Sequence, residues 1–153
     1  MKNFLALLFF LFACGPDYLI LDGRYNIEGQ VTEDTCFYDL YSFATGWDIT
    51  NTDEMHLQLL NSSSGAIFNL ELQEDAYKTQ AESISHYEEY EGYSFFENFV
   101  LVLVPQTEKT FKGTITDSFI ISDDGLTDSY ECTILAVFEG TFAAPLSDKD
   151  LIK

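Results

Sequence analysis

The stretch GRYNIEGQV, residues 23–31, alternates apolar and polar side chains with a period of two residues. One side carries Tyr25, Ile27, Gly29 and Val31, and the other carries Arg24, Asn26, Glu28 and Gln30. Such alternation is typical of a β-strand that has one buried face and one exposed face. The stretch therefore predicts a strand over residues 23–32 that lies against a hydrophobic core.

Similar patterns continue along the rest of the chain. We predict further strands at 47–51, 55–61, 66–73, 76–83, 93–104, 110–121 and 129–142. Turn residues at 61–65 and 123–125 separate neighbouring strands, Pro105 ends the apolar run before it, and the acidic segment 85–92 is predicted to be a loop. About eight strands in succession predict an all-β fold.

The segment 35–46 has two possible structures. Phe37, Leu40, Tyr41 and Ala44 have helical spacing, and Gly46 would end such a helix. The aromatic residues of the same segment also fit an extended chain. We expect a short helix or an irregular stretch here, leading into the strand at 47–51.

Size and charge limit the functions that the chain can have. It contains 153 residues, with 26 acidic against 7 basic residues and a formal net charge of -19. This length predicts one domain with a sizeable core. The basic residues are scattered, whereas nucleic acids and anionic membrane surfaces attract clustered Lys and Arg. We therefore expect no nucleic-acid partner and no electrostatic attraction to a membrane.

The N-terminus has the features of an export signal. Lys2 precedes an unbroken apolar run at 4–12, which is too short to span a bilayer as a helix. The segment Leu11-Phe12-Ala13-Cys14 resembles the lipobox of bacterial lipoproteins, with an aliphatic residue at -3, a small residue at -1 and the cysteine that is modified. Phe12 is bulkier than that pattern usually allows. The alternative is an ordinary secretory signal with an incidental cysteine.

The lipobox resemblance implies a membrane-anchored protein. It implies that residues 1–13 are removed as a signal peptide, that Cys14 carries acyl chains inserted into the lipid bilayer, and that 14–22 form a lipidated tether. Residues 23–153 then form the single domain. Gly15 stands where the inner-membrane retention signal of enteric bacteria has Asp, which favours the outer membrane within the bacterial cell envelope.

The two remaining cysteines constrain the topology. An exported protein matures where disulfides persist, so Cys36 and Cys132 are predicted to pair. This requires the end of the first strand to lie beside the start of the last, and the two strands to run antiparallel. A closed up-and-down meander with an even number of strands has that arrangement. The alternative is two free, buried thiols.

The domain resembles the lipocalin-like, or calycin, group of small up-and-down barrels. Gly23-Arg24-Tyr25 stands where that group often has Gly-x-Trp, and the succession of strands over residues 23–142 fits the same architecture. The resemblance implies a small hydrophobic ligand held inside an antiparallel barrel. A β-sandwich is the alternative, since the same alternation would serve two facing sheets.

The barrel interior is the predicted ligand site. The inward-facing aromatic residues are Tyr25, Phe68, Phe111, Phe119, Phe138 and Phe142. A barrel of this size either fills its interior with such rings or encloses one small cavity. The strand at 93–104 is apolar on both faces, so its outer face needs a cover. We expect that cover to be either the 35–46 segment or another protein.

Residues suited to catalysis or metal binding are few. The two histidines, His56 and His86, are explained as exposed polar residues on the surface. Asp123, Asp124 and Asp128 could offer oxygen ligands to calcium, but they lie in an ordinary turn sequence. No nucleophile elbow or phosphate-binding loop is present, although a pair of carboxylates would be revealed only by geometry. We expect a protein that is not an enzyme and uses no metal or cofactor. We predict a membrane-anchored lipoprotein that binds a small apolar ligand in its barrel. The alternative is an envelope lipoprotein with a structural or protein-interaction role, a filled core and no ligand.

Overall fold

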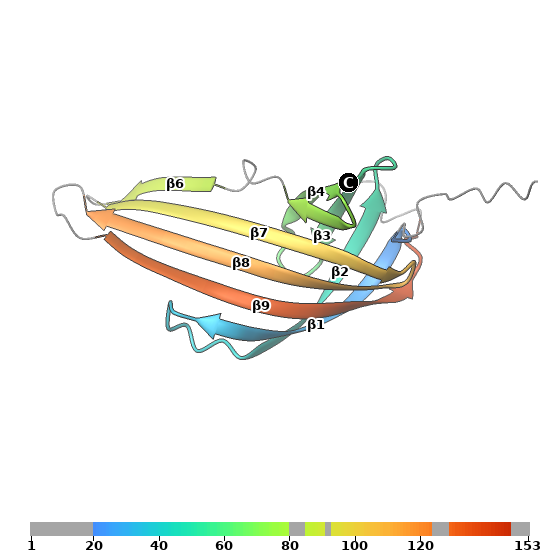
Figure 1. The fold of residues 1–153 in the computed structure, drawn as a ribbon, viewed down its shortest axis with the longest axis horizontal. Helices are drawn as coiled ribbons and strands as arrows, with labels where there is room; N and C mark the ends of the chain where they lie inside the picture. The colour runs from blue at the N-terminus through green and yellow to red at the C-terminus, as the bar shows by residue number, and fades with distance from the viewer. Residues whose placement is uncertain (1–19, 80–84, 91–92, 124–128, 148–153) are drawn as a thin grey trace, which may run out of the picture.

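The computed structural model describes residues 20–79, 85–90, 93–123 and 129–147, and within them the chain forms nine β-strands and no helix (Figure 1). The strands are β1 (Gly23–Asp34), β2 (Ser42–Asn51), β3 (His56–Asn61), β4 (Ile67–Gln73), β5 (Ala76–Thr79), β6 (Ser85–Tyr90), β7 (Tyr93–Thr107), β8 (Thr110–Asp123) and β9 (Ser129–Ala144). The prediction of an all-β fold is confirmed.

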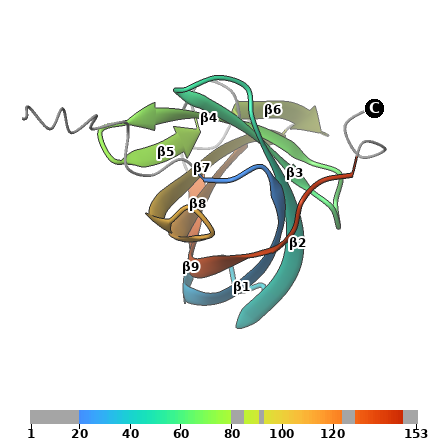
Figure 2. The ribbon, with the colours of Figure 1, turned by 90° about the vertical axis from the view of Figure 1, so that its right-hand side faces the viewer.

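Eight of these strands close into a barrel. The order is β5-β4-β3-β2-β1-β9-β8-β7, each neighbour is antiparallel, and the ring closes where Tyr77 and Lys78 of β5 pair with Leu103 and Val102 of β7. Figure 2 shows the ring nearly end-on. The predicted antiparallel up-and-down barrel is confirmed, and the β-sandwich alternative is wrong.

The barrel has two unlike ends. At the base end, Gly23 begins β1 and the turn between β7 and β8 lies beside it, with the Leu21 amide donating to the Glu108 carbonyl at 2.9 Å. At the arm end, β7, β8 and β9 continue beyond the ring, and β6 pairs with residues 93–98 of β7 (Figure 1). Because β6 flanks the ring, the nine described strands are compatible with an eight-stranded barrel.

Alternation in the sequence sets the two faces of the sheet. Along β1, Tyr25 and Ile27 are buried, whereas the alternate residues Arg24, Asn26 and Glu28 are exposed. Three inward-facing glycines each lie under an aromatic ring from the neighbouring strand: Gly29 under Phe43, Gly113 under Phe138, and Gly140 under Phe111. A Cβ at any of the three would overlap that ring. The glycines therefore make room for large side chains inside a tightly curved sheet.

A disulfide joins Cys36 to Cys132, with a Cα–Cα distance of 5.0 Å and a sequence separation of 96. β1 and β9 lie side by side and antiparallel, paired from Arg24↔Ala144 to Asp34↔Ile134 with two register shifts along the way. Both the predicted pairing of the cysteines and the predicted relation between the first and last strands are confirmed.

Several predicted boundaries were wrong. The segment 35–46 contains no helix: it is irregular up to Tyr41, and from Ser42 it is strand, because Ser42 to Gly46 pair with β1. Part of the predicted acidic loop is strand β6. β7 runs past Pro105 to Thr107, with a register shift that accommodates the proline. Of the strand predicted at 76–83, β5 covers Ala76–Thr79, and 80–83 lie outside the described residues.

The predicted signal peptide at 1–13, Cys14 and the tether up to residue 19 lie outside the described residues. Where the description begins, Ile20 is fully buried in the core at the base end. Within the described part of the chain, no helix is long and apolar enough to cross a membrane.

Candidate functional site

Five aromatic rings fill the barrel interior at the base end. This base plug consists of Tyr25, Trp47, Phe111, Phe138 and Phe142. Ring centroids are 5.1 Å apart for Tyr25 and Phe111, 5.5 Å for Tyr25 and Phe142, and 4.9 Å for Trp47 and Phe138. Such tilted and edge-to-face contacts are favourable for aromatic pairs. Four of the six predicted ligand-binding residues, Tyr25, Phe111, Phe138 and Phe142, thus lie in the base plug.

The base plug contains two polar groups: the Trp47 Nε1 atom is buried with no hydrogen-bond partner, whereas the Tyr25 hydroxyl is satisfied by the backbone. The Tyr25 hydroxyl donates to the Leu21 carbonyl at 2.8 Å and lies 3.3 Å from the Glu108 carbonyl. Burial raises the pKa of Tyr25 above its ordinary value, and the nearby negative charge of Asp22 raises it further. Tyr25 therefore remains a neutral donor that ties the plug to the entering chain.

The other two predicted ligand-binding residues lie towards the arm end. Phe68 stacks on Phe99 with ring centroids 5.0 Å apart, and Phe119 meets Tyr38 edge to face at 6.4 Å. Phe68, Phe99 and Phe119 are half-buried, whereas Phe111 and Phe138 of the plug are buried. The structure therefore divides the predicted set between a packed base and a partly open arm end.

A carboxyl pair lies on the inner face of the arm. Asp117 of β8 is half-buried, and its Oδ1 atom is buried with no hydrogen-bond partner. Burial, followed by the charge of the neighbouring Glu97 of β7 and a side-chain hydrogen bond to it, together raise the pKa of Asp117 to about 7. This pair cannot be predicted from the sequence, because only the strand register brings residues 20 positions apart together. The one available signal was Asp117 at an inward position of an otherwise apolar pattern.

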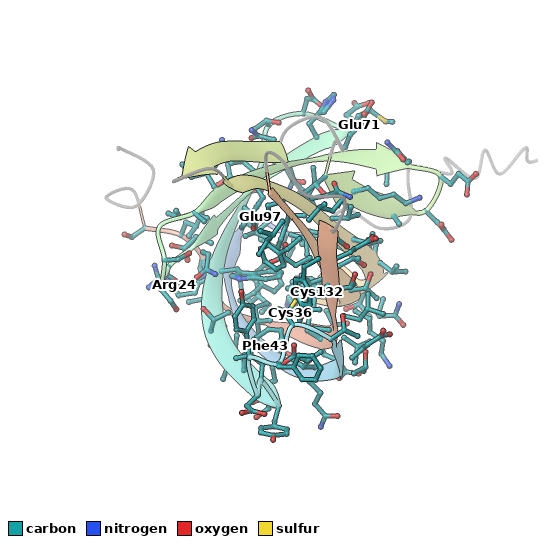
Figure 3. All side chains as sticks on the ribbon, turned by 90° about the vertical axis from the view of Figure 1, so that its left-hand side faces the viewer. Arg24, Cys36, Phe43, Glu71, Glu97 and Cys132 are labelled. Carbon is teal, nitrogen blue, oxygen red and sulfur yellow. A yellow bond between two sulfur atoms is a disulfide. The ribbon has the colours of Figure 1, made fainter. Side chains whose placement is uncertain are left out.

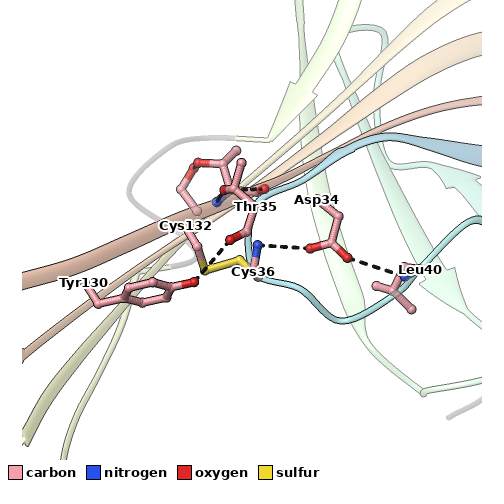
Figure 4. Close-up of a disulfide and its surroundings, with 8 residues drawn as sticks. Asp34, Thr35, Cys36, Leu40, Tyr130 and Cys132 are labelled. Carbon is pink, nitrogen blue, oxygen red and sulfur yellow. Dashed lines mark hydrogen bonds between the residues drawn. A yellow bond between two sulfur atoms is a disulfide. The ribbon is translucent and has the colours of Figure 1, made fainter.

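The disulfide holds a loop at the arm end (Figure 4). The Asp34 carboxylate accepts hydrogen bonds from the amides of Cys36 at 3.0 Å and Leu40 at 3.4 Å. Thr35 exchanges backbone and side-chain hydrogen bonds with Thr133 of β9, and the Tyr130 hydroxyl donates to the Thr35 carbonyl at 3.1 Å. Figure 3 shows Cys36 and Cys132 together when the arm end faces the viewer.

A groove of about 1150 Å³ lies on the outer surface of the barrel. Most of its lining residues face outward from five strands, β2, β1, β9, β8 and β7, and the groove also reaches the inward-facing positions Gly29, Phe43, Gly113 and Phe138. Val102 and Val104 of β7 and Val137 of β9 form its apolar part. The 35–46 segment was one of the two expected covers for the outer face of the strand at 93–104. Its residues Ser42 and Ala44 line the same groove as Val102 and Val104 of that strand.

Charges cross the middle of this outer groove in one row. Glu28 of β1 lies directly opposite Glu139 of β9, and Glu139 lies opposite Lys112 of β8. The Lys112 Nζ atom is 3.0 Å from Glu139 Oε1, and both side chains are well exposed. The two adjacent glutamates repel each other across the strands. A basic group entering the groove would relieve that repulsion.

Among the described residues, no group of three or more His, Cys, Asp or Glu side chains is arranged to hold a metal ion. His56 lies at the start of β3, with Nδ1 2.8 Å from Asp53 Oδ1. The Met55 amide, and then the His56 side chain, hold the pKa of Asp53 below its usual value through hydrogen bonds. The side chains of His86 and Asp123, and residues Asp124 and Asp128, lie outside the description.

Comparison with protein-family models, with curated proteins and with solved structures found no match for this chain.

Proposed function

We propose that this chain is a non-enzymatic lipoprotein of the bacterial cell envelope, held on the membrane by acyl chains on Cys14, whose barrel binds other proteins through its outer surface. The Leu11-Phe12-Ala13-Cys14 segment supports the lipid anchor, and Gly15 favours the outer membrane. Lipidation on Cys14 would hold the protein without a spanning segment, because several acyl chains together give stable anchoring.

The geometry fits such an anchor. Cys14 is six residues before Ile20, which is buried at the base end. Six extended residues reach about 20 Å. The base end would therefore stay close to the bilayer, and the arm end would point away from it.

The observation that carries the proposal is the base plug. A carrier of the lipocalin-like kind uses the barrel interior for its ligand, and here contacting rings occupy the base half of that interior. Apolar side chains that a partner could bury, Val102, Val104 and Val137, line the outer groove instead. Large apolar surface at a groove marks interaction sites in soluble domains.

A small-ligand carrier is the second candidate. The half-buried Phe68, Phe99 and Phe119 favour it, because they face inward at the arm end and are less enclosed than the plug. A ligand there would be apolar and would lie beside the Glu97 and Asp117 carboxyls.

Two experiments test the proposal. Radioactive palmitate should label the wild-type chain and leave Cys14→Ala unlabelled. The Cys14→Ala variant should also be released from the membrane fraction. Equal labelling of both chains would remove the lipid anchor.

The choice between the two candidate functions needs a search for a bound ligand. The protein purified from its membrane should be denatured and extracted with organic solvent. We expect no small molecule at a one-to-one ratio by mass spectrometry, and an equimolar apolar compound would favour the carrier.

A further inference from the structure

The irregular loop that follows the disulfide cysteine exposes four large side chains. In this aromatic loop, residues 37–41, the exposed fractions are 80% for Phe37, 59% for Tyr38, 48% for Leu40 and 76% for Tyr41. Single exposed apolar residues are common, but several in one short loop form a patch of the kind that marks binding surfaces. Aromatic residues are also enriched among those that contribute most to protein interfaces.

The aromatic loop is held in one conformation. Cys36 is fixed by its disulfide, the Asp34 carboxylate bonds to two amides across the loop, and the Tyr41 carbonyl accepts from the Val31 amide at 3.0 Å. Phe37 and Asp39 have positive φ angles of 60° and 55°, a region that residues other than glycine seldom adopt. Such strain persists where the surroundings over-determine the backbone, and it is common at binding sites. A loop already ordered loses little entropy when it binds.

Charge restricts the partner. Glu33, Asp34 and Asp39 lie in or beside the loop, and Glu131 lies on the neighbouring β9. No Lys or Arg occurs in residues 31–41, 93–101, 113–123 or 129–135, the segments that form the arm end. A second copy of this chain or an anionic bilayer would therefore be repelled, whereas a basic surface would be attracted.

We propose that the aromatic loop is the docking site for a protein that presents an apolar pocket bordered by lysine and arginine. The exposed rings of Phe37 and Tyr41 would enter the pocket, and the surrounding carboxylates would face its basic border. This inference rests on the proposed function, since it names the surface and the partner chemistry of a protein-binding lipoprotein. The arm-end position suits it, because this end would point away from the membrane if Cys14 anchors the chain.

The test uses the full lipidated chain in the bacterium that produces it. The photoreactive amino acid p-benzoylphenylalanine replaces Tyr41 in the aromatic loop, Val137 in the outer groove, or Gln58, an exposed residue of β3, as a control. After irradiation, we expect one protein to be linked through position 41 and not through position 58. That protein is then purified, and its affinity for the chain is measured directly.

Surface variants decide whether the loop carries the binding. The double variant Phe37→Ser/Tyr41→Ser should bind the purified partner about 100-fold more weakly, because two anchoring rings are lost. Ile67→Ser is the matched control: Ile67 is 59% exposed on β4, and its replacement should leave the affinity unchanged. The association rate should fall as salt is raised and should fall several-fold in Asp39→Asn.

Specific results overturn the inference. Unaltered affinity of the double variant for the partner would overturn it. So would cross-linking at position 41 that captures lipid, glycan or a second copy of the chain, or that captures nothing. A partner linked through position 137 alone would leave the proposed function standing and remove the loop as its site. Links from neither position would count against both.

Discussion

The two ends of the barrel are stabilised by different means. At the base end, Tyr25, Trp47 and Phe111 are buried in mutual contact, and burial of apolar surface holds the fold there. At the arm end, the inward-facing Phe68 and Phe119 are only half-buried, and a disulfide and hydrogen bonds hold the chain instead. The difference shows how a small barrel can leave large side chains only partly buried without losing its fold.

The largest expected loss of stability comes from removing the disulfide at the arm end. Replacement of both Cys36 and Cys132 by alanine should lower the free energy of unfolding by about 4 to 5 kcal/mol, because the disulfide closes a long loop in the unfolded chain. Urea unfolding of the variant, and of the wild type with and without a reducing agent, measures this. A loss below about 1 kcal/mol would show that packing alone stabilises the arm end.

Matched substitutions of one phenylalanine at each end compare how tightly the barrel interior is packed at the two ends. Phe111→Ala should cost about 3 to 5 kcal/mol, because it removes a buried ring and leaves a cavity in the base plug. Phe119→Ala should cost about half of that or less, because Phe119 is half-buried. Equal losses in chemical denaturation would contradict the distinction between a packed base and a partly open arm end.

The carboxyl pair gives the arm end its own pH dependence. The folded-state pKa of Asp117, about 7, lies above its ordinary value of 3.8, so the folded state binds the proton more tightly. The folded state is therefore destabilised as pH rises from about 4 to about 7, and below pH 4 this group has no effect. Allowing for solvent screening, the wild type should lose about 1 to 2 kcal/mol more than Asp117→Asn across this window.

The measurement is the free energy of unfolding at pH 4 and pH 7.5 for both chains. Glu97→Gln serves as the control, because it removes the neighbouring charge and should reduce the pH dependence without abolishing it. Parallel curves for the wild type and Asp117→Asn would mean that Asp117 titrates as an ordinary exposed carboxyl.

The smallest expected effect lies on the outer surface between the two ends. Glu28→Gln should stabilise the fold by up to about 0.5 kcal/mol at low salt, because Glu28 faces Glu139 directly across β1 and β9. The gain should disappear at high salt, where exposed charges are screened. Thermal unfolding at two salt concentrations measures it, and destabilisation at low salt would indicate that Glu28 makes a favourable contact.

The features of the fold that follow from local pattern were predictable. Period-two alternation located β1, β3, β4, β8 and β9 to within a few residues, because one side of each strand must face the core. The pairing of Cys36 with Cys132 followed from the cysteine count together with the expectation of an exported chain, and it placed β1 beside β9. The closed meander could then be inferred before any contact was known.

Features that depend on the register between distant strands were not predictable. Glu97 and Asp117 meet because β7 and β8 pair in one particular register, which their sequences do not specify. The helical spacing of Phe37, Leu40 and Tyr41 was misleading, since the disulfide and Asp34 impose an irregular loop that leaves all three exposed. The packing of Trp47 into the base plug likewise required the ring to be closed.

Quenching of tryptophan fluorescence by acrylamide tests the central claim most directly, because Trp47 is the sole tryptophan of the chain and lies within the base plug with 3% of its surface exposed. If the barrel interior is filled there, the folded protein should emit at short wavelength and resist quenching as a buried tryptophan does. Phe111→Ala, if it stays folded, should increase quenching, and Phe119→Ala should not. Efficient quenching of the folded wild type would contradict the account, because it would mean that small molecules reach the base of the barrel.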